Sequence, residues 1–292
     1  MKIILFSRPL SETHREKIVQ IFAAIEQYGF DFTINREAVP SVEQFIGRTI
    51  ATEKHYGNSV GEITSDAVMV CYGGDGTLLE GVHRLDGNDI PVVGINSGRL
   101  GFLALAQSTE IDEVFKQIAE NKLLIEKRAM IAITGNFEGK HQTIYALNEV
   151  AVQRLGATMI SVDISIDSMP TLTCNGDGVI ISTPTGSTAY SLSVGGPIMM
   201  PENHNLIIAP VASHSLNVRP LIIPDNWKID LKVSSRSHSY LASIDGRSIT
   251  MPDTATISIS KADYTVRIIR LEGHSFLNTL KTKLMWGADV RS

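Results

Sequence analysis

The sequence is poor in cysteine, has no long apolar run and shows no excess of positive charge. Only two of its 292 residues are cysteine, so at most one disulfide is available. Cys71 stands in an apolar segment, where a buried free thiol is expected. No stretch approaches the roughly 18 apolar residues of a membrane helix, and the first residues lack the apolar core of a secretory signal. We therefore expect a cytoplasmic protein that does not enter a membrane.

The charge balance excludes one class of partner. Lys and Arg total 26 against 31 for Asp and Glu, a net charge of -5. A nucleic-acid binder that relies on phosphate neutralisation needs the opposite balance, so no nucleic-acid partner is expected. A small anionic ligand stays possible, because a few backbone amides can bind one phosphate group. The 43% hydrophobic and 20% charged residues are typical of a globular protein with one or two domains.

The first 122 residues alternate between strand and helix patterns. Continuous or alternating apolar runs predict strands at residues 3–6, 30–34, 67–72 and 90–95. Apolar residues at helical spacing predict helices at residues 18–25, 78–85 and 111–118, the first with Ser11 as its N-cap and Gly29 as its stop. Strands that alternate with helices form parallel βαβ units. We predict a Rossmann-like α/β domain over residues 1–122.

The pattern changes beyond residue 122. Short alternating strands dominate residues 123–270, for example at 162–166, 229–233 and 257–260, with turn residues between them. This spacing predicts an all-β, sandwich-like second domain. The last segment, residues 271–292, has apolar side chains at helical spacing and is expected to pack back on the first domain.

The run Gly73-Gly74-Asp75-Gly76-Thr77 follows a buried strand and precedes a helix. Ligands of α/β sheets bind at the carboxyl ends of strands, and glycines there let backbone N–H groups approach phosphate oxygens. A carboxylate repels phosphate, so Asp75 is better explained as a base, or as a group that holds Mg²⁺ or a hydroxyl. The alternative is an ordinary turn in which Asp75 caps the helix. No Walker loop is present, because no Gly-Lys-Ser/Thr follows.

Two further segments carry polar side chains in apolar surroundings. Asn148 and Glu149 interrupt residues 146–152, which otherwise have a strand pattern; they either bind a ligand or lie at a solvent-facing strand end. Residues 175–193 open from an apolar strand at 179–181 into hydroxyl residues around a proline and a glycine. Such a cluster can hold several polar atoms of one ligand, and Tyr190 can stack on a base. The alternative is a Ser/Thr-rich loop.

Together these three segments resemble the NAD kinases, which phosphorylate the 2′-hydroxyl of the adenosine ribose of NAD to give NADP. Residues 94–103, 195–198 and 213–221 are also similar to family segments, so ordered matches extend from Gly73 to Asp245. A lone Gly-Gly-Asp-Gly run also occurs in lipid kinases and phosphofructokinases. The 175–193 stretch is much more specific.

The resemblance implies that Asp75 is the general base for the 2′-hydroxyl. A ribose hydroxyl is a very weak acid, so its proton leaves during transfer, and most of the rate comes from alignment and charge neutralisation. The implied NAD contacts are Asp75, Gly76, Phe102, Asn148, Glu149, Asn175, Asp177, Thr185, Thr188, Ala189, Tyr190 and Ser193. Asp177 matches a carboxylate at the nicotinamide end, and the last four match adenine and ribose contacts.

By the same resemblance the phosphoryl donor is ATP with Mg²⁺ or another divalent cation, and polyphosphate is a possible donor. No His cluster shows metal-ligand spacing. In the family, Asp177 often reaches the NAD of a neighbouring subunit, which implies a homo-oligomer, commonly a tetramer with sites at subunit interfaces.

Some positions depart from the family pattern or match it loosely. Glu80 stands where many relatives carry a basic residue. Asp245 and Arg247 belong to a loosely matching turn and are secondary candidates. Lys281 and Lys283 are expected to be solvated helix positions.

Two other functions remain open at this point. One is a kinase with the same glycine turn that acts on a lipid or a sugar. The other is a nucleotide-binding regulator without turnover. A Rossmann dehydrogenase is disfavoured, because residues 7–11 after the first strand lack a Gly-x-Gly-x-x-Gly fingerprint.

Overall fold

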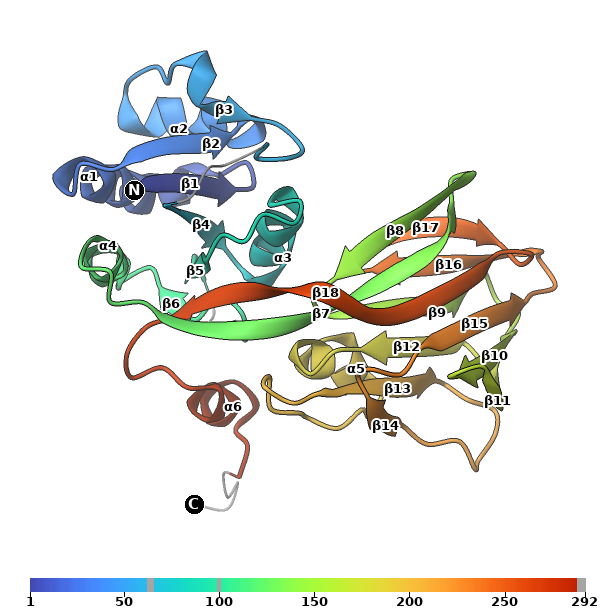
Figure 1. Ribbon diagram of the computed structural model, residues 1–292. Helices are drawn as coiled ribbons and strands as arrows, with labels where there is room; N and C mark the ends of the chain where they lie inside the picture. The colour runs from blue at the N-terminus through green and yellow to red at the C-terminus, as the bar shows by residue number, and fades with distance from the viewer. Residues whose placement is uncertain (62–65, 99–100, 288–292) are drawn as a thin grey trace. The chain divides into compact units, whose positions relative to one another are not determined.

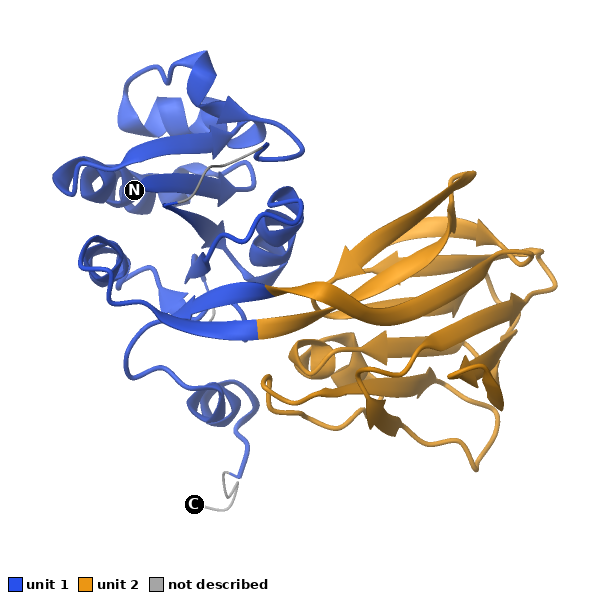
Figure 2. Cartoon of the chain, viewed as in Figure 1, with its two compact units in different colours: residues 1–127, 266–292 blue, residues 128–265 orange. Residues whose placement is uncertain are grey.

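The chain divides into two compact units in the computed structural model, which describes residues 1–61, 66–98 and 101–287 (Figure 1). Unit 1 comprises Met1–Lys127 and Val266–Ser292, and unit 2 comprises Arg128–Thr265 (Figure 2). The strands β7 (Leu124–Phe137) and β18 (Thr256–Arg270) each run from one unit into the other. The boundaries expected at residues 122 and 270 therefore differ from those of the structure, because a continuous strand gives no compositional sign of a boundary.

The core of unit 1 is a parallel sheet in the order β3-β2-β1-β4-β5, with the short β6 paired to β5. The strands are β1 (Lys2–Ser7), β2 (Asp31–Asn35), β3 (His55–Tyr56), β4 (Ala67–Gly73), β5 (Val92–Asn96) and β6 (Ala106–Gln107). Four of them confirm the strands predicted from the sequence. The end of β18 joins the same sheet, where Ile268 pairs with Val92.

Helices connect these strands and cover the sheet. They are α1 (Arg15–Gln27), α2 (Val39–Ile46), α3 (Asp75–Arg84) and α4 (Ile111–Ala119). A further helix of unit 1, α6 (Phe276–Leu284), comes from the end of the chain, and its Phe276 packs against Phe102. The apolar face of α1 packs into the core of the sheet, and Gly29 follows the helix with a φ of 64°. The prediction of Ser11 as the N-cap of this helix is wrong. Ser11 precedes a 3-10 turn, and α1 begins only at Arg15.

The strand order places a topological switch point between β1 and β4. From β1 the chain proceeds to β2 and β3 on one side, and then crosses to β4 and β5 on the other. The loops after the carboxyl ends of β1 and β4 leave in opposite directions from this point, which is where α/β sheets bind their ligands. The Gly73–Thr77 run follows β4 here.

Unit 2 is built from two antiparallel sheets with one shared apolar core. One sheet has the order β14-β13-β12-β9-β16-β17, and the other contains β11-β10-β15-β18 together with β7 and β8. The strands are β8 (Lys140–Ala146), β9 (Glu149–Arg154), β10 (Ile160–Ile166), β11 (Met169–Gly176), β12 (Gly178–Ser182), β13 (Asn205–Val211), β14 (Leu221–Pro224), β15 (Ile229–Ser234), β16 (Ser239–Ile244) and β17 (Arg247–Pro252). Buried Val, Ile and Leu side chains from both sheets form the core. The α/β unit followed by a β-sandwich-like unit is the predicted fold class, which is confirmed.

One predicted strand is in fact two. The run at residues 146–152 is broken, because β8 ends at Ala146 and β9 begins at Glu149. The two strands belong to different sheets of unit 2. Asn148 therefore lies where the chain crosses from one sheet to the other.

The six-stranded sheet of unit 2, which contains β12, carries a small layer on its outer face. The 3-10 turn η4 (Thr185–Thr188) and the single-turn helix α5 (Tyr190–Ser193) follow β12. Tyr190 and Val194 pack there on apolar side chains that include Ala151 and Ile180. Among the described residues, no helix combines the length and the apolar character needed to cross a membrane.

Candidate active site

Asp75 is the first residue of α3, directly after the carboxyl end of β4. Its carboxylate accepts hydrogen bonds from three consecutive backbone N–H groups of another loop. Phe102 donates to Oδ2 at 2.8 Å, and Leu103 and Ala104 donate to Oδ1 at 3.1 and 3.0 Å. The helix N-cap is Gly74. The alternative in which Asp75 only caps its own helix is therefore wrong.

These bonds fix the carboxylate and leave part of it available. A carboxylate offers about four acceptor positions, of which three are occupied by the loop. The close approach depends on Gly101, because a Cβ built at that residue would lie 1.8 Å from Asp75 Oδ1. The fourth acceptor position, for which the described residues supply no donor, can take the proton of one hydroxyl group.

Two further residues lie near the Asp75 turn: Arg8, which follows β1, and Phe102, from the loop that binds the Asp75 carboxylate. Arg8, just beyond β1, donates to the carbonyl oxygen of Gly76 at 3.4 Å and to Glu80 at 3.1 Å. Glu80 also pairs with Arg84. The acid at position 80 is thus part of an ion-pair chain. Phe102 is buried, and its ring packs against the ring of Phe276 in α6, with centroids 6.0 Å apart.

Lys283 is exposed, as expected from the sequence, but it also faces Asp75. Its Nζ lies 4.0 Å from Asp75 Oδ2 and 4.7 Å from the centroid of the Phe102 ring. Lys281, on the same turn of α6, is exposed as expected. The helix therefore brings a cation to the carboxylate, and the sequence analysis missed this residue.

In unit 2, Asp245 has the same relation to the Asn148–Glu149 segment that Asp75 has to its loop. Its carboxylate accepts from the backbone N–H groups of Leu147, Asn148 and Glu149, at 2.7, 2.8 and 3.1 Å. In return, the N–H of Asp245 donates to the carbonyl of Glu149 at 3.1 Å. Asp245, a secondary candidate from its sequence match, thus holds the chain at the crossing between the two sheets. Arg247, two residues on, is exposed at the start of β17.

The side chains of Asn148 and Glu149 are buried, with 7% and 8% exposure, so the alternative of a solvent-facing strand end is wrong. Asn148 Oδ1 and Glu149 Oε2 have no hydrogen-bond partner among the described residues. Burial, and after it the negative charge of Asp245, raises the pKa of Glu149 to about 8, against the opposing effect of a hydrogen bond from the Tyr190 backbone. A buried polar atom without a partner costs free energy, which a ligand can recover.

The segment after β12 lies against these two residues. The N–H of Thr183 donates to the Asn148 carbonyl at 2.9 Å, and the Thr183 hydroxyl donates to the Leu147 carbonyl at 2.5 Å. Gly186 packs closely here, since a Cβ on it would lie 2.2 Å from the Asn148 carbonyl oxygen. The hydroxyl groups of Thr185 and Ser191 are buried, and the described part of the chain supplies no hydrogen-bond partner for them.

The remaining predicted residues of this segment are more open. Thr188 donates to the Thr185 carbonyl at 3.4 Å, and Ala189 connects the 3-10 turn to α5. The hydroxyl of Tyr190 accepts a hydrogen bond from Gln153 at 2.6 Å, and Ser193 is exposed at the end of α5. The predicted residues from 148–149 and 185–190 are therefore brought together within unit 2.

Asn175 and Asp177 lie at the opposite end of β12. The five residues of β12 separate Asp177 from Thr183, a span of about 20 Å. Asp177 accepts from Arg154 Nε at 2.6 Å, and the carbonyl of Asn175 accepts from the N–H of His214 at 2.8 Å. Within one chain, these two residues are not brought next to Glu149.

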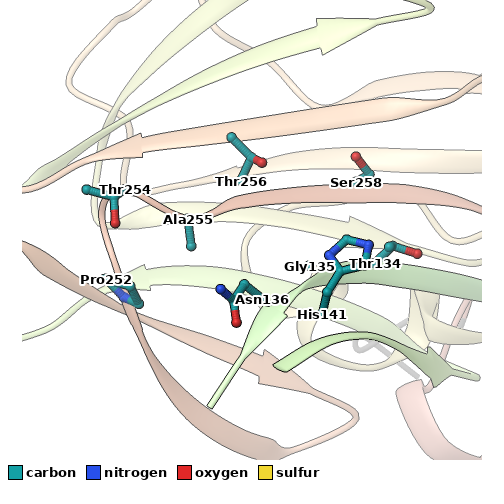
Figure 3. Close-up of a pocket in the computed structure, with 9 residues that line it drawn as sticks. All are labelled: Thr134, Gly135, Asn136, His141, Pro252, Thr254, Ala255, Thr256 and Ser258. Carbon is teal, nitrogen blue, oxygen red and sulfur yellow. The ribbon is translucent and has the colours of Figure 1, made fainter. Parts of the chain in front are cut away.

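A separate depression of about 260 Å³ lies in unit 2, near the turn between β7 and β8 and the start of β18 (Figure 3). The residues that line it are Thr134, Gly135, Asn136, His141, Pro252, Thr254, Ala255, Thr256 and Ser258. Figure 3 shows Thr, Ser, Asn and His side chains around it together with Pro252 and Ala255, and none of these residues was predicted as a site residue.

Comparison with known families assigns both parts of the chain. The ATP-NAD kinase N-terminal domain matches residues 36–123, and the ATP-NAD kinase C-terminal domain matches residues 147–271. These matches define the chain as an enzyme, a kinase.

Named relatives match along the chain. An NAD kinase of Bacteroides fragilis is 39% identical over 293 residues, covering 100% of both chains. An NAD kinase of Porphyromonas gingivalis is 43% identical over 224 residues, covering 76% of this chain and 77% of its own. The chain therefore belongs to the NAD kinase family, and the resemblance inferred from the sequence is confirmed.

Solved structures share the fold. Yeast NADH kinase complexed with NADH has a TM-score of 0.87 at 21% identity, covering 99% of this chain and 88% of that one. An NAD kinase from Archaeoglobus fulgidus in complex with ATP has a TM-score of 0.74 at 23% identity, covering 98% and 99%.

Proposed function

We propose that this enzyme transfers the γ-phosphoryl group of ATP to the 2′-hydroxyl of the adenosine ribose of NAD, giving NADP and ADP. Family membership supports this reaction, and the geometry of Asp75 is the observation that carries it. The carboxylate lies at the switch point of an α/β sheet, is fixed by three N–H donors and keeps one acceptor position for a hydroxyl proton.

In the proposed step, Asp75 acts as the general base. The 2′-oxygen forms a bond to the γ-phosphorus, the bond between that phosphorus and the β,γ-bridging oxygen breaks, and ADP leaves. The proton of the hydroxyl moves to the free position on the Asp75 carboxylate. Because the transition state of phosphoryl transfer is loose, orientation and charge neutralisation supply most of the rate, and the base adds a smaller share.

We propose NAD contacts in each unit of the chain. In unit 1 these are Asp75, Gly76 and Phe102. In unit 2, the orphaned atoms of Asn148, Glu149 and Thr185 support a dinucleotide site, because ribose hydroxyls and amide groups supply the missing hydrogen bonds. The other proposed contacts are Asn175, Asp177, Thr188, Ala189, Tyr190 and Ser193.

We propose that Mg²⁺ enters with the phosphoryl donor. Among the described residues, no group of three or more His, Cys, Asp or Glu side chains is arranged to hold a metal ion. We propose that phosphate oxygens of the donor and water molecules supply most of the Mg²⁺ ligands, as is common for that ion. When bound, the ion neutralises charge on the donor phosphates; polyphosphate would bring its cation in the same way.

We propose a homo-oligomer, commonly a tetramer in this family, in which Asp177 reaches the NAD of a neighbouring subunit. Its position at the far end of β12 from Thr183 supports a contact from a different chain. Exposed apolar side chains on the edge strand β14, Leu221 and Ile222 at 40% and 47%, support a subunit interface there. Light scattering should give the mass of an oligomer for the wild type and a smaller mass for Ile222→Lys, but not for Val19→Lys, an exposed position of α1.

A cytoplasmic location is part of the same proposal. Both cysteines, Cys71 and Cys174, are free and buried, as suits a reducing compartment.

The test is an assay of NADP formation from NAD, ATP and Mg²⁺ with an NADP-specific dehydrogenase as the detector. We expect NADP in proportion to enzyme. Phosphorylation of diacylglycerol or of a sugar in place of NAD would support the other type of kinase. Tight NAD binding without turnover would instead support a regulator.

A further inference from the structure

The C-terminal helix α6 packs two side chains across the ring of Phe102. Phe276 and Lys283 are seven residues apart, so they lie on the same face of the helix. The Phe276 ring centroid is 6.0 Å from that of Phe102, and Lys283 Nζ is 4.7 Å from the same centroid. The N-cap Ser275, whose side chain accepts from the Asn278 N–H, fixes where the helix begins.

The same ammonium group faces the Asp75 carboxylate. Lys283 Nζ lies 4.0 Å from Asp75 Oδ2, the oxygen that accepts the Phe102 N–H. At that separation the contact is an interaction of charges, longer than a hydrogen bond. Asp75 already has three N–H donors to fix its orientation, so it does not need the lysine to hold it in place.

A structural role is the simpler alternative. A lysine in the last turn of a helix interacts favourably with the helix dipole wherever its side chain points. Lys281, which lies on the same turn and is exposed, can make this interaction with the helix dipole. Lys283, whose side chain is 33% exposed, lies in addition over Phe102 and beside the reactive carboxylate.

In the proposed reaction, the positive charge of Lys283 can assist the approach of the phosphoryl donor. Asp75 is negative, and the terminal phosphate of the donor has to come close to the hydroxyl that Asp75 accepts. The two negative charges repel each other, and a partly buried charge is screened less by salt than an exposed one. A cation beside the carboxylate reduces this repulsion at the place where the phosphoryl group must arrive.

We propose that Lys283 is a positioning residue for the phosphoryl donor: it offsets the charge of Asp75, so that the terminal phosphate can approach the acceptor hydroxyl. The inference rests on the proposed function and adds to it a residue from the end of the chain. It assigns α6 a part in donor binding as well as in packing.

A double-mutant cycle on donor binding tests this role. The probe is a non-hydrolysable ATP analogue with Mg²⁺, titrated by calorimetry into wild type, Lys283→Met, Asp75→Asn and the double variant. We expect Lys283→Met to weaken binding roughly tenfold when Asp75 is present, and by less than about threefold in the Asp75→Asn background. Lys283→Arg should retain most of the affinity because it keeps the charge, and Lys281→Met should bind as the wild type does.

Steady-state kinetics provide the second measurement. In Lys283→Met the KM for ATP should rise by at least about fivefold, while the KM for NAD changes less than about twofold. Circular dichroism and thermal melting show whether each variant is folded, and Lys283→Gln replaces Lys283→Met if the latter is not.

The outcomes separate the two proposals. An equal loss of affinity in both backgrounds, or no loss in either, overturns the role of Lys283 when the wild type forms NADP. If the wild type forms no NADP, the proposed function fails, and the role of Lys283 falls with it.

Discussion

The carboxylate of Asp75 fills the space that a side chain at Gly101 would need. A Cβ built on Gly101 would lie 1.8 Å from Asp75 Oδ1, which is far inside contact distance. The next three residues along the chain donate their N–H groups to this carboxylate. Glycine at position 101 therefore lets the loop close on Asp75.

Gly101→Ala should reduce turnover because the added methyl group pushes the loop and the carboxylate apart. A misplacement of about 1 Å at a reacting group costs on the order of 10²-fold in rate, so we expect kcat to fall by about 10–10². Steady-state NADP formation measures the effect. Gly98→Ala is the matched control, since a Cβ there would have no atom of the described residues within 4 Å, and its kcat should stay within about twofold. Similar losses in both variants would contradict this account of the loop.

Asp75→Asn should separate binding from chemistry. The amide keeps one oxygen as an acceptor for the loop but cannot take a proton from the hydroxyl. We expect NAD affinity to stay within roughly tenfold, while turnover drops by at least ~10². Calorimetry and NADP formation give the two quantities, with Asp86→Asn, an exposed position just after α3, as control. Turnover near the wild-type level in Asp75→Asn would remove the residue from the base role.

The sequence was sufficient to predict the reactive carboxylate but not what holds it. Asp75 stands out because an acid between glycines is unusual after a buried strand. Its three donors are backbone N–H groups, which nearly every residue carries, so they leave no mark in the sequence. Strands with apolar runs, such as β1 and β4, were predicted for the opposite reason: burial on both faces requires a distinct composition.

The sequence-based predictions mainly lacked the contacts between distant parts of the chain. The helical spacing of apolar side chains in residues 271–292 predicted α6. Nothing in that pattern says which residue the helix meets, so Lys283 was assigned to solvent. The crossing at Asn148 was hidden for a similar reason, because apolar residues on both sides of it belong to strands of different sheets.

Asp245→Asn should loosen the crossing between the sheets of unit 2. The carboxylate accepts from Leu147, Asn148 and Glu149, and an amide has one oxygen in place of two. Loss of such bonds at a partly buried site should lower the free energy of unfolding by about 1–3 kcal/mol. The KM for NAD should rise as well, because Asn148 and Glu149 lose their fixed position. Urea unfolding and kinetics measure the two effects.

Asp163→Asn is the control for Asp245→Asn. Asp163 is exposed on β10, and the bond it receives from the Thr173 hydroxyl goes to a single oxygen, which asparagine retains. The control should unfold within about 0.5 kcal/mol of the wild type. A loss in Asp245→Asn no larger than this would show that the three backbone bonds do not hold the crossing.

Glu149→Gln should change how stability depends on pH. Burial and the charge of Asp245 raise the pKa of Glu149 from 4.5 to about 8 in the folded protein. The folded state therefore binds a proton that the unfolded state has lost between these pH values. The contribution of this proton to stability is complete below pH 4.5 and disappears as the pH rises through about 8. The glutamine side chain does not ionise, so the variant does not lose stability in this way as the pH rises.

Relative to the wild type, Glu149→Gln should consequently gain stability between about pH 5 and about pH 9, by an amount on the order of a few kcal/mol. Thermal or urea unfolding across this range, without ligand, gives the difference at each pH. Glu202→Gln, at an exposed glutamate of the same unit, is the matched control. A difference for Glu149→Gln that does not grow with pH would mean that Glu149 is ionised in the folded protein, and that the orphaned oxygen finds a partner without a ligand.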